Sequence, residues 1–490
     1  MMVMSAHDPM HLSDLVGEFG VVGAVNPPVS GLALDSRDVK PGDCFIALAG
    51  AREHGSRYAA AAAAAGAAAV LTEEIDVLPR IRIPVLRIEK LRQHVGEMAA
   101  RFYAHPARAM GVIAVTGTNG KTTVAHLCAD ALRALHGQCA YFGTLGYGMF
   151  GELAPSANTT PNPLLLQRVL ADMRTRGCAH VALEASSHAL DQGRLNGLDI
   201  GVAIFTGLGH DHLDYHGTIA AYGEAKQRLF AHPGLHTAII NVDDAYAPVI
   251  HAAVAPGVKV LTFGTQAAAD LRAIALETDG SGSRLTVRTP AGDANFASAL
   301  VGDFNVQNLL AALGALLALG TPQSQAVDAL SVARPVRGRL ELAATTPRVY
   351  VDYAHSPDSL ARVLVTVRGL TAGRVICVFG CGGERDASKR PLMGAVAERE
   401  ADRVIVTSDN PRSEVPAAIA AQIVAGMRAP TDALIALDRA EAIGMALREA
   451  GPGDAVLIAG KGHETTQTTG AETAPFDDVA VVRRILGLTS

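Results

Sequence analysis

The segment from Val112 to His136 constrains the fold more than any other part of this chain. The apolar run Val112–Val115 predicts a strand, the glycine-rich run Thr116–Thr123 (TGTNGKTT) follows, and a helical stretch continues to His136. A strand that turns through glycines into a helix directs backbone N–H groups and the positive end of the helix at one point, which favours phosphate binding. The usual P-loop has a further glycine five residues before Gly120, where this chain has Val115. A plain glycine turn is therefore the alternative interpretation.

Short apolar strands alternate with helical stretches on both sides of this segment. Such alternation is typical of a parallel, doubly wound α/β sheet. The run Leu271–Arg288 instead alternates apolar and polar residues, which predicts an antiparallel edge. The other strands are predicted at Val181–Leu183, Gly201–Phe205, Thr237–Asn241, Val349–Asp352, Arg374–Phe379, Arg403–Thr407 and Ala455–Ala459.

The length of 490 residues predicts about three domains. We expect boundaries near Pro106 and Pro335, which give domains at residues 1–106, 107–335 and 336–490. In the first domain, alanine-rich Tyr58–Ala69 predicts a helix, because alanine has the highest helix propensity. The expected fold is α/β: a small N-terminal unit, a central parallel sheet carrying the phosphate loop, and a Rossmann-like C-terminal domain.

Composition excludes several classes of protein. The formal charge is −6, so the chain as a whole offers no basic face for nucleic acid. The six cysteines include no C-x-x-C pair, which is typical of reduced cysteines in a cytoplasmic protein. The first residues show no signal peptide, and the longest apolar runs are shorter than a membrane span. We expect a soluble cytoplasmic protein with neither a nucleic acid nor a membrane as partner.

Two polar segments follow predicted strands of the central domain. Glu184 comes directly after Val181–Leu183, where a carboxylate beside a phosphate loop is placed to hold Mg²⁺, although a helix-capping acid is an equal alternative. Gly209–Gly217 (GHDHLDYHG) contains three histidines and two aspartates, which indicates a metal or phosphate site or, alternatively, a polar surface loop. No cysteine accompanies these histidines, so Mg²⁺ is favoured over zinc.

Four polar loops follow the predicted strands of the last domain. Because they leave the carboxyl ends of parallel strands, we expect them at one ligand-binding edge. Their arginines and acids suit a zwitterionic ligand, since arginine pairs with carboxylate and glutamate accepts from ammonium. Ordinary surface salt bridges are the alternative for any one loop. The loops begin at Asp352 (DYAH), Gly380 (GCGGERDASKR), Asp409 (DNPR) and Gly460 (GKGHE).

The order of these motifs resembles the Mur ligase family. The matching segments are GTNGKTT, EASSH, HDHLDYHG, YGEAK, DYAHSPDSL, GCGGERD, SDNPR and GKGHE, and the resemblance runs from Asp35 to Glu464. It implies a monomeric, ADP-forming amide ligase of peptidoglycan precursor synthesis. In that reaction ATP phosphorylates the D-glutamate side chain of UDP-N-acetylmuramoyl-L-alanyl-D-glutamate, and the amine of an incoming amino acid attacks the acyl phosphate.

The resemblance also implies roles for single residues. The catalytic ones are Lys121, Glu184, His212 and Lys226, and the last is expected as a carbamate formed with CO₂; an exposed helix lysine is its alternative. The implied Mg²⁺ ligands are Thr122, Thr123, Glu184, His212 and the Lys226 carbamate. Implied ATP contacts are Gly117, Thr118, Asn119, Gly120, Lys121, Thr122, Thr123, Asn305, Asn308, Arg339 and Asp352. Implied contacts of the UDP-sugar substrate are Leu34, Ser36, Arg52, Glu53, Asn158, Thr159, Thr160, Ser186, Gln192 and Arg194.

The Asp-Asn-Pro-Arg form of the third-domain motif implies meso-2,6-diaminopimelate as the amino acid, whose distal carboxylate needs a cation. Its implied contacts are Arg385, Asp409, Asn410, Pro411, Arg412, Gly460 and Glu464. The alternatives are the same ligase using L-lysine, a P-loop kinase or ATPase, and a nucleotide-binding scaffold without turnover. Two departures from the family are noted: Gly207 and Gly209, expected to loosen their loop, and His54, where aspartate is common.

Overall fold

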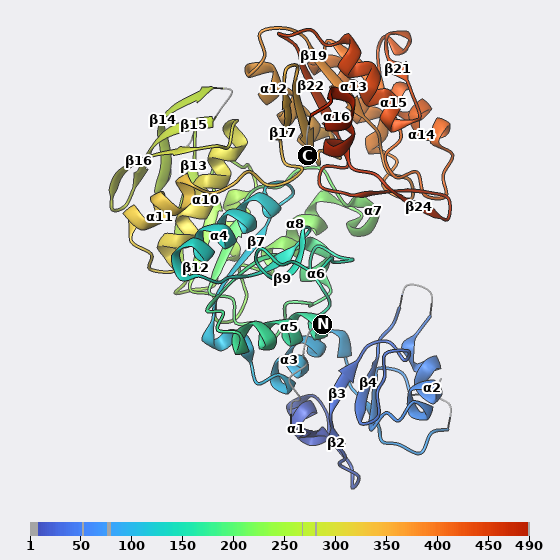
Figure 1. Ribbon diagram of the computed structural model, residues 1–490. Coiled ribbons are helices and arrows are strands. Elements are labelled where there is room, and N and C mark those ends of the chain that lie inside the picture. Colours follow the sequence, from blue (N-terminus) through green and yellow to red (C-terminus); the bar gives the residue numbers. More distant parts are fainter. Residues whose placement is uncertain (1–7, 51–52, 76–79, 267, 280–281, 489–490) are drawn as a thin grey trace.

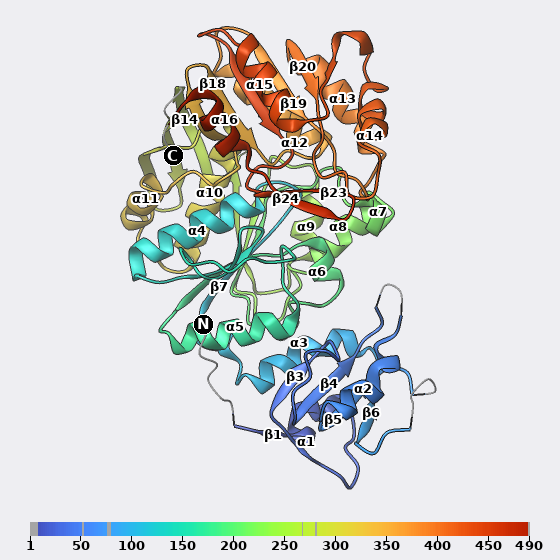
Figure 2. The same cartoon turned by 45° about the vertical axis from the view of Figure 1, so that its right-hand side comes forward.

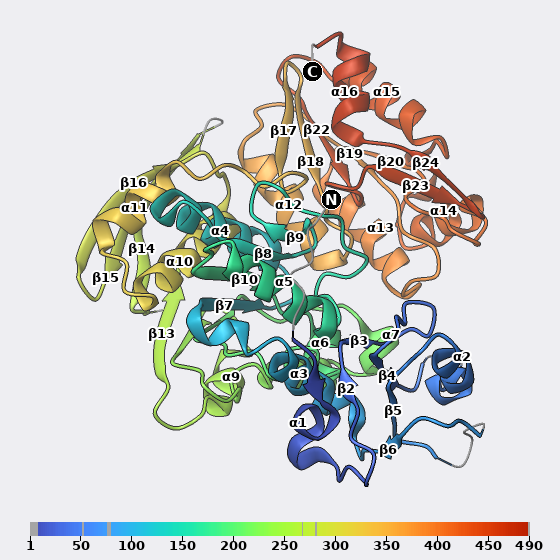
Figure 3. The same cartoon turned by 60° about the horizontal axis from the view of Figure 1, so that its bottom comes forward.

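The computed structural model describes residues 8–50, 53–75, 80–266, 268–279 and 282–488. Each of three groups of elements contains its own sheet, and the groups follow one another along the chain from blue to red (Figure 1). The turned view in Figure 3 separates the small N-terminal sheet from the central and C-terminal ones. The expected three-part α/β fold is confirmed.

The N-terminal unit is built on a four-stranded parallel sheet in the order β3-β4-β5-β6. Apolar side chains on its two faces pack against α3 and α1 on one side and α2 on the other. A short hairpin of β1 and β2 precedes it. The elements are β1 (Met10–His11), α1 (Leu12–Val16), β2 (Pro28–Val29), β3 (Gly31–Ala33), β4 (Asp43–Ala47), α2 (Ala59–Ala64), β5 (Ala69–Thr72), β6 (Val85–Arg87) and α3 (Leu91–Phe102).

The predicted alanine helix is shorter than expected. It was predicted over Tyr58–Ala69, but α2 ends at Ala64, and Ala69 already begins the buried strand β5. Gly66 turns the chain between them at a φ of +95°, close to Pro41. Helix propensity is a weak preference, and pairing with Cys44 of β4 stabilises Ala69 in the strand.

The central unit contains a ten-stranded sheet in the order β16-β15-β14-β13-β12-β11-β7-β10-β8-β9. The seven strands from β14 to β8 in this order run parallel to their neighbours. Strands β15 and β16 at one edge and β9 at the other pair antiparallel, so the predicted antiparallel edge is confirmed. Helices α4, α10 and α11 cover one face, and α5 and α9 cover the other. The strands are β7 (Gly111–Thr116), β8 (Ala140–Gly143), β9 (Gly146–Met149), β10 (His180–Glu184), β11 (Val202–Phe205), β12 (Thr237–Asn241), β13 (Lys259–Gly264), β14 (Leu271–Asp279), β15 (Gly282–Thr289) and β16 (Gly292–Ser298).

The helices of this unit differ greatly in length. The two longest, α4 and α10, contact each other and lie on the same face of the sheet. Short helices α6, α7 and α8 follow the carboxyl ends of strands and present the polar motifs. The helices are α4 (Lys121–His136), α5 (Pro163–Thr175), α6 (Ser187–Asp191), α7 (Leu213–His216), α8 (Ile219–Gln227), α9 (Ala247–Ala253), α10 (Asp303–Ala318) and α11 (Gln323–Ser331).

The C-terminal unit has a six-stranded sheet in the order β17-β18-β22-β19-β20-β21, parallel apart from β17. Helices α12, α13 and α14 cover one face, and α15 and α16 cover the other. It stands over the central unit in Figure 2. Its elements are β17 (Glu341–Thr345), β18 (Arg348–Asp352), α12 (Pro357–Gly369), β19 (Val375–Phe379), α13 (Lys389–Glu400), β20 (Arg403–Val406), α14 (Pro416–Val424), β21 (Leu434–Ile435), α15 (Arg439–Glu449), β22 (Ala455–Ala459), β23 (Thr466–Thr469), β24 (Glu472–Pro475) and α16 (Asp478–Leu486).

The structure also describes the state of the cysteines and the apolarity of the helices. All six cysteines are buried and unpaired. In the part of the chain that the structure describes, no helix has the length and apolarity that crossing a bilayer requires.

Candidate active site

The predicted phosphate loop joins β7 to α4 as expected. Gly117 and Gly120 adopt φ angles of +149° and +87°, which favour glycine, and a Cβ on Gly120 would lie 2.7 Å from Asn308 Oδ1. The Lys121 ammonium donates to the carbonyl oxygens of Gly117 and Thr118, each at 2.9 Å. Burial lowers the pKa of Lys121. The loop therefore presents a desolvated lysine at the amino end of a long helix, where an anion is favoured.

Glu184 is the most heavily bonded carboxylate at this edge. It is fully buried at the end of β10, and it accepts hydrogen bonds from Thr122 Oγ1 (2.9 Å) and Tyr141 OH (2.9 Å). Thr144 adds two more, from its backbone N at 2.8 Å and its hydroxyl at 3.2 Å. Because Glu184 is inside the strand, the helix-capping alternative is wrong; Ser186 caps α6 instead.

Lys226 lies on α8 with 1% of its surface exposed, so the exposed-lysine alternative is wrong. Its Nζ donates to Gly117 O at 2.9 Å, the same carbonyl oxygen that accepts from Lys121, and lies 4.2 Å from the centre of the Tyr222 ring. Burial, together with the nearby Lys121, lowers the pKa of Lys226 well below its usual value. The amine is therefore favoured in its neutral form.

Asp211 joins the loop after β11 to the C-terminal domain. Its carboxylate lies 3.5 Å from His212 Nε2 and 3.8 Å from His355 Nε2. Burial raises the pKa of Asp211, but the nearby His355, His212 and two lysines outweigh this effect and lower it. Burial also lowers the pKa of His212, so the imidazole is neutral and able to act as a ligand.

The loop containing Gly207 and Gly209 is firmly held, contrary to the expectation that these glycines loosen it. Leu208 N donates to Asp244 Oδ2 at 3.0 Å, and Gly209 N donates to Thr118 Oγ1 at 2.8 Å. A Cβ on Gly207 or Gly209 would lie 2.7 Å or 2.6 Å from a carboxylate oxygen, of Asp244 or Asp358 respectively. The glycines thus let two carboxylates approach the backbone.

The connection between the central and C-terminal domains carries Arg339 into the same space. Its Nη2 donates to Thr122 Oγ1 at 3.0 Å, and its guanidinium lies 4.6 Å from the centre of the Tyr353 ring. Its Nε is buried and has no hydrogen-bond partner among the described residues. Arg339 therefore retains donor capacity for a further anion beside the phosphate loop.

Asp352 ends β18 and accepts from the backbone of Leu340 (2.7 Å) and Ala354 (2.7 Å). Burial raises its pKa to about 6. Asp358, at the start of α12, accepts from His210 N at 3.0 Å and so links the two domains directly. The carboxylates of this domain thus hold the linker and the loop after β11 in place.

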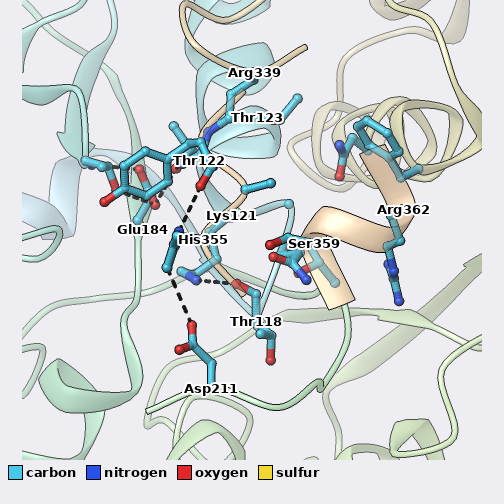
Figure 4. Close-up of a pocket in the computed structure, with 18 of the residues that line it drawn as sticks. Thr118, Lys121, Thr122, Thr123, Glu184, Asp211, Arg339, His355, Ser359 and Arg362 are labelled. Atoms are coloured by element: carbon cyan, nitrogen blue, oxygen red, sulfur yellow. Dashed lines mark hydrogen bonds and ion pairs between the residues drawn. The ribbon is translucent and has the colours of Figure 1, made fainter. Parts of the chain in front are cut away.

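These groups surround one cavity between the two domains. Figure 4 shows Lys121, Thr122 and Glu184 of the central domain facing the same space as Arg339 and His355. Asn308 also lines it, whereas Asn305 holds Asn308 through a bond of 3.0 Å and is not itself in the lining. Of the predicted site residues, the cavity lining contains Thr118, Asn119, Gly120, Lys121, Thr122, Thr123, Thr159, Glu184, Ser186, His212, Lys226, Asn308, Arg339 and Asp352.

The residues predicted along the sugar–peptide path form a chain of hydrogen bonds beside this cavity. Thr160 Oγ1 donates to Glu184 O (2.6 Å) and Ser186 Oγ (3.1 Å), and Arg194 Nη1 donates to Thr160 O (2.8 Å). Gln192 accepts from Arg194 at 2.7 Å. Asn158 is exposed at the edge of the path.

Four of the predicted UDP-sugar contacts, Leu34, Ser36, Arg52 and Glu53, belong to the N-terminal unit, and none of the described residues of that unit lines the central cavity. Leu34 and Ser36 follow β3, and Glu53 accepts from Tyr58 OH at 2.8 Å. Arg52 lies outside the described residues. His54 accepts from Ser56 N (3.2 Å) at the start of the turn Gly55–Tyr58, which is the capping role an aspartate could fill.

The loops predicted to bind the amino acid meet at one edge of the C-terminal sheet. Arg385 and Arg412 both flank Gly382, and Arg412 Nη1 donates to Gly383 O at 2.6 Å. On the same loop as Arg412, Asn410 Nδ2 donates to Oε2 of Glu464, which lies on the loop after β22, at 2.7 Å. The edge thus offers cationic and anionic side chains together.

Asp409, Pro411 and Gly460 shape this edge from inside. All three are buried or nearly so, and a Cβ on Gly460, at φ +109°, would lie 2.6 Å from Asp409 Oδ2. Burial raises the pKa of Asp409. Glycine at 460 thus allows the two loops to pack together.

The described residues contain no group of three His, Cys, Asp or Glu side chains that would bind a metal by itself. A carboxylate and hydroxyls suit Mg²⁺, which usually takes one or two protein ligands and completes its shell with water and substrate phosphates. Glu184 beside Thr122 fits that pattern, and the neutral His212 lines the same cavity.

The comparison with known families decides the identity of this fold. Residues 28–103, 115–316 and 338–462 match, in turn, the Mur ligase family catalytic domain, the Mur ligase middle domain and the Mur ligase glutamate ligase domain. This chain belongs to the Mur ligase family.

This Mur ligase is similar along its length to curated relatives. It is 44% identical over 467 residues to the UDP-N-acetylmuramoyl-L-alanyl-D-glutamate–2,6-diaminopimelate ligase of Coxiella burnetii, covering 94% of this chain and 96% of that protein. It is 44% identical over 460 residues to the protein of the same name in Pseudomonas aeruginosa, covering 93% of this chain and 94% of that protein.

Solved structures agree in fold. A structure titled with the same ligase name superposes with a TM-score of 0.72 at 38% identity, covering 98% of this chain and 99% of the other. MurF from Acinetobacter baumannii is 21% identical and superposes with a TM-score of 0.66, covering 93% of this chain and 96% of that chain, so it shares the fold.

Several residues that line the cavity or hold its side chains were not predicted from the sequence as site residues. Tyr141 and Thr144 reach Glu184 from β8 and the turn after it, and His355 reaches Asp211 only because two domains dock. Asp211 and His355 lie inside motifs that the sequence does show, HDHLDYHG and DYAHSPDSL. Tyr141 and Thr144 have no such signal.

Proposed function

We propose that this chain is the ATP-dependent ligase that joins meso-2,6-diaminopimelate to the D-glutamate side-chain carboxylate of UDP-N-acetylmuramoyl-L-alanyl-D-glutamate. It acts as a monomer in the cytoplasm, with domains at residues 1–106, 107–335 and 336–490. The observation that carries the proposal is the pairing of a phosphate loop with an edge of mixed charge on the next domain, joined through Arg339. The likeness to curated diaminopimelate ligases supports it.

The first step is phosphoryl transfer. A carboxylate oxygen of the substrate bonds to the γ-phosphorus of ATP as the bond to the ADP oxygen breaks. Both reactants are anions, so two cations of the cavity neutralise charge and align them: Lys121, at the carbonyls of the phosphate loop, and Arg339, at Thr122. Thr122, Thr123, Glu184 and His212 would hold Mg²⁺, which supplies further neutralisation of the phosphate charge when bound.

The second step is amide formation. The diaminopimelate amine attacks the carbonyl carbon of the acyl phosphate, loses a proton, and inorganic phosphate leaves. Arg412 and Arg385 pair with carboxylate, and Asn410 and Glu464 contact the ammonium end. L-Lysine has no distal carboxylate, so the arginines would lose their partner and discriminate against it.

Lys226 is carbamylated in the working enzyme. A neutral amine adds to CO₂ and releases one proton, which gives a carboxylate-like group in place of a buried amine. The burial of Nζ and the proximity of Lys121 support this, because both favour the neutral amine that reacts with CO₂, and Lys121 would attract the negative charge of the carbamate.

The carbamate is tested by Lys226→Ala. We expect loss of most activity and partial recovery when a short carboxylate such as acetate is added, with Glu224→Ala, an exposed change on the same helix, as the control. Full activity of Lys226→Ala would remove the carbamate from the mechanism.

The function itself is tested by measuring ADP release with the UDP-muramoyl dipeptide and meso-diaminopimelate, L-lysine or no amino acid. Release only with diaminopimelate, with a product heavier by that residue, supports the proposal. Preference for lysine would retain the ligase and refute the interpretation of Arg412. Release without an amino acid would indicate a kinase or ATPase.

A further inference from the structure

Lys461 is a buried cation in the middle of the amino-acid edge. It follows β22, its exposed fraction is 0%, and its Nζ donates to three oxygens. These are Glu464 Oε2 at 3.0 Å, Thr466 O at 2.6 Å and Asn410 Oδ1 at 3.4 Å. All three protons of the ammonium are therefore used inside the protein, which leaves none for a ligand.

The partners of Lys461 form a closed arrangement with each other. Glu464 Oε2 accepts from both Lys461 and Asn410 Nδ2, the latter at 2.7 Å. Asn410 Oδ1 in turn accepts from Thr468 N at 2.9 Å, so its amide orientation is fixed. One carboxylate oxygen of Glu464 is thus occupied, while no hydrogen bond from the described residues reaches Oε1.

The two hydrogen bonds to Glu464 Oε2 determine the direction in which Oε1 points. The Glu464 side chain is 31% exposed, unlike Lys461, so the carboxylate lies at the boundary between the buried cation and solvent. An unrestrained glutamate has three rotatable bonds, and fixing one oxygen with two donors leaves the other in a defined direction. The arginines that would bind carboxylate lie on two other loops, Arg385 on the loop after β19 and Arg412 on the loop after β20.

A second buried ion pair braces the strands from which these loops leave. Arg439 pairs with Asp478 at 2.7 Å and donates to Ser408 O (3.3 Å) and Ala459 O (3.0 Å), at the ends of β20 and β22. Apart from its pairing with Asp478, Arg439 therefore contacts backbone oxygens. Lys461 contacts one backbone oxygen, Thr466 O, and in addition the side chains of Asn410 and Glu464.

We propose that Lys461 is a positioning residue for amino-acid recognition, which orients Glu464 so that its Oε1 accepts from the ammonium group of the incoming diamino acid. The inference rests on the proposed function, because it takes this edge as the amino-acid site. Lys461 touches no reacting atom and acts through Glu464.

The test is a double-mutant cycle of Lys461→Met and Glu464→Gln, with KM for diaminopimelate, KM for ATP and kcat measured by ADP release. Loss of a hydrogen bond to a charged group should raise KM for diaminopimelate about 10- to 100-fold in each single variant. KM for ATP should stay within about twofold of the wild type. The double variant should be no worse than the weaker single variant, because both changes disable the same contact.

The controls separate this role from a structural one. Lys259→Met changes an exposed lysine on β13 and should alter none of the constants. If Lys461→Met does not fold, Lys461→Gln keeps a donor and is measured in its place, with an expected rise in KM smaller than that for Met. Melting temperatures are compared for all variants.

Three results would overturn the inference. The first is that the two single effects multiply in the double variant, which would mean that Lys461 acts independently of Glu464. The second is that KM for ATP rises as much as KM for diaminopimelate. The third is that Lys461→Gln binds diaminopimelate as the wild type does. A wild-type enzyme with no diaminopimelate-dependent ADP release would refute the proposed function instead, before any variant is compared.

Discussion

Replacing Glu184 tests the four-donor arrangement around a fully buried carboxylate. In Glu184→Gln, one amide oxygen can still accept from Thr144 N and Tyr141 OH. The amide NH₂ can donate to the hydroxyls of Thr122 and Thr144, since a hydroxyl can reverse its role. Every group therefore keeps a partner, and only the charge is removed.

The expected changes in unfolding free energy follow from the number of hydrogen bonds that each variant keeps. Each bond weakens by about 0.5–1 kcal/mol when its acceptor loses its charge, but the uncharged side chain also avoids the desolvation penalty of a buried carboxylate. We expect a net change in unfolding free energy within about 2 kcal/mol. Glu184→Ala instead leaves three donors without a partner, since the Thr144 hydroxyl can still donate to Thr159 Oγ1. At about 1 kcal/mol or more for each of the three, it should cost at least about 3 kcal/mol.

The assay compares thermal unfolding and ADP release of both variants. Glu184→Gln should keep most of the thermal stability yet lose about 100- to 1,000-fold in kcat, the usual cost of removing a group that stabilises transition-state charge. Glu184→Ala should lose both. The reasoning fails if Glu184→Gln is as unstable as Glu184→Ala, or if it retains more than about a tenth of the wild-type kcat.

Three other predictions concern the C-terminal domain and its contact with the central domain. Arg412→Lys should raise KM for diaminopimelate about 10- to 100-fold without changing KM for ATP, because a lysine ammonium cannot donate the two parallel hydrogen bonds of a planar guanidinium. An equal rise in both constants would indicate a structural role. Because burial raises the pKa of Asp352 from 3.8 to about 6, its contribution to stability is greatest below about pH 4 and falls by about 3 kcal/mol up to pH 6. Stability of Asp352→Asn, measured by denaturation across that range, should lack this fall, and parallel curves would contradict the assignment. Gly209→Ala should displace Asp358 and cost about 1 kcal/mol by differential scanning calorimetry relative to Gly369→Ala, which has no atom within 4 Å of the new Cβ; equal melting temperatures would show that the contact contributes nothing.

The sequence was sufficient for features that are local. The phosphate loop, the strands that precede each polar loop and the antiparallel run after Leu271 depend on residues within a short window, and each was predicted at nearly its observed position. The end of α2 was not, because pairing with β4 decides it and propensity does not.

The rest of the candidate site could not be predicted, because it depends on contacts between residues that are far apart in the sequence. Tyr141 is 43 residues from Glu184 in sequence, and His355 meets Asp211 across a domain boundary. The expected looseness of Gly207 and Gly209 failed for the same reason: Asp244 and Asp358, far along the chain, occupy the space beside them. Spacing within a motif carries no information on such partners.

The burial of all six cysteines makes this protein convenient for spectroscopy. Burial raises the pKa of their thiols, so thiol reagents that need a thiolate should leave the native protein unlabelled. Cysteines introduced at exposed Thr175 on α5 and Ala418 on α14 would then be the only reactive ones. A fluorophore pair at these sites would report the distance between the central and C-terminal domains during turnover, with every native cysteine left in place.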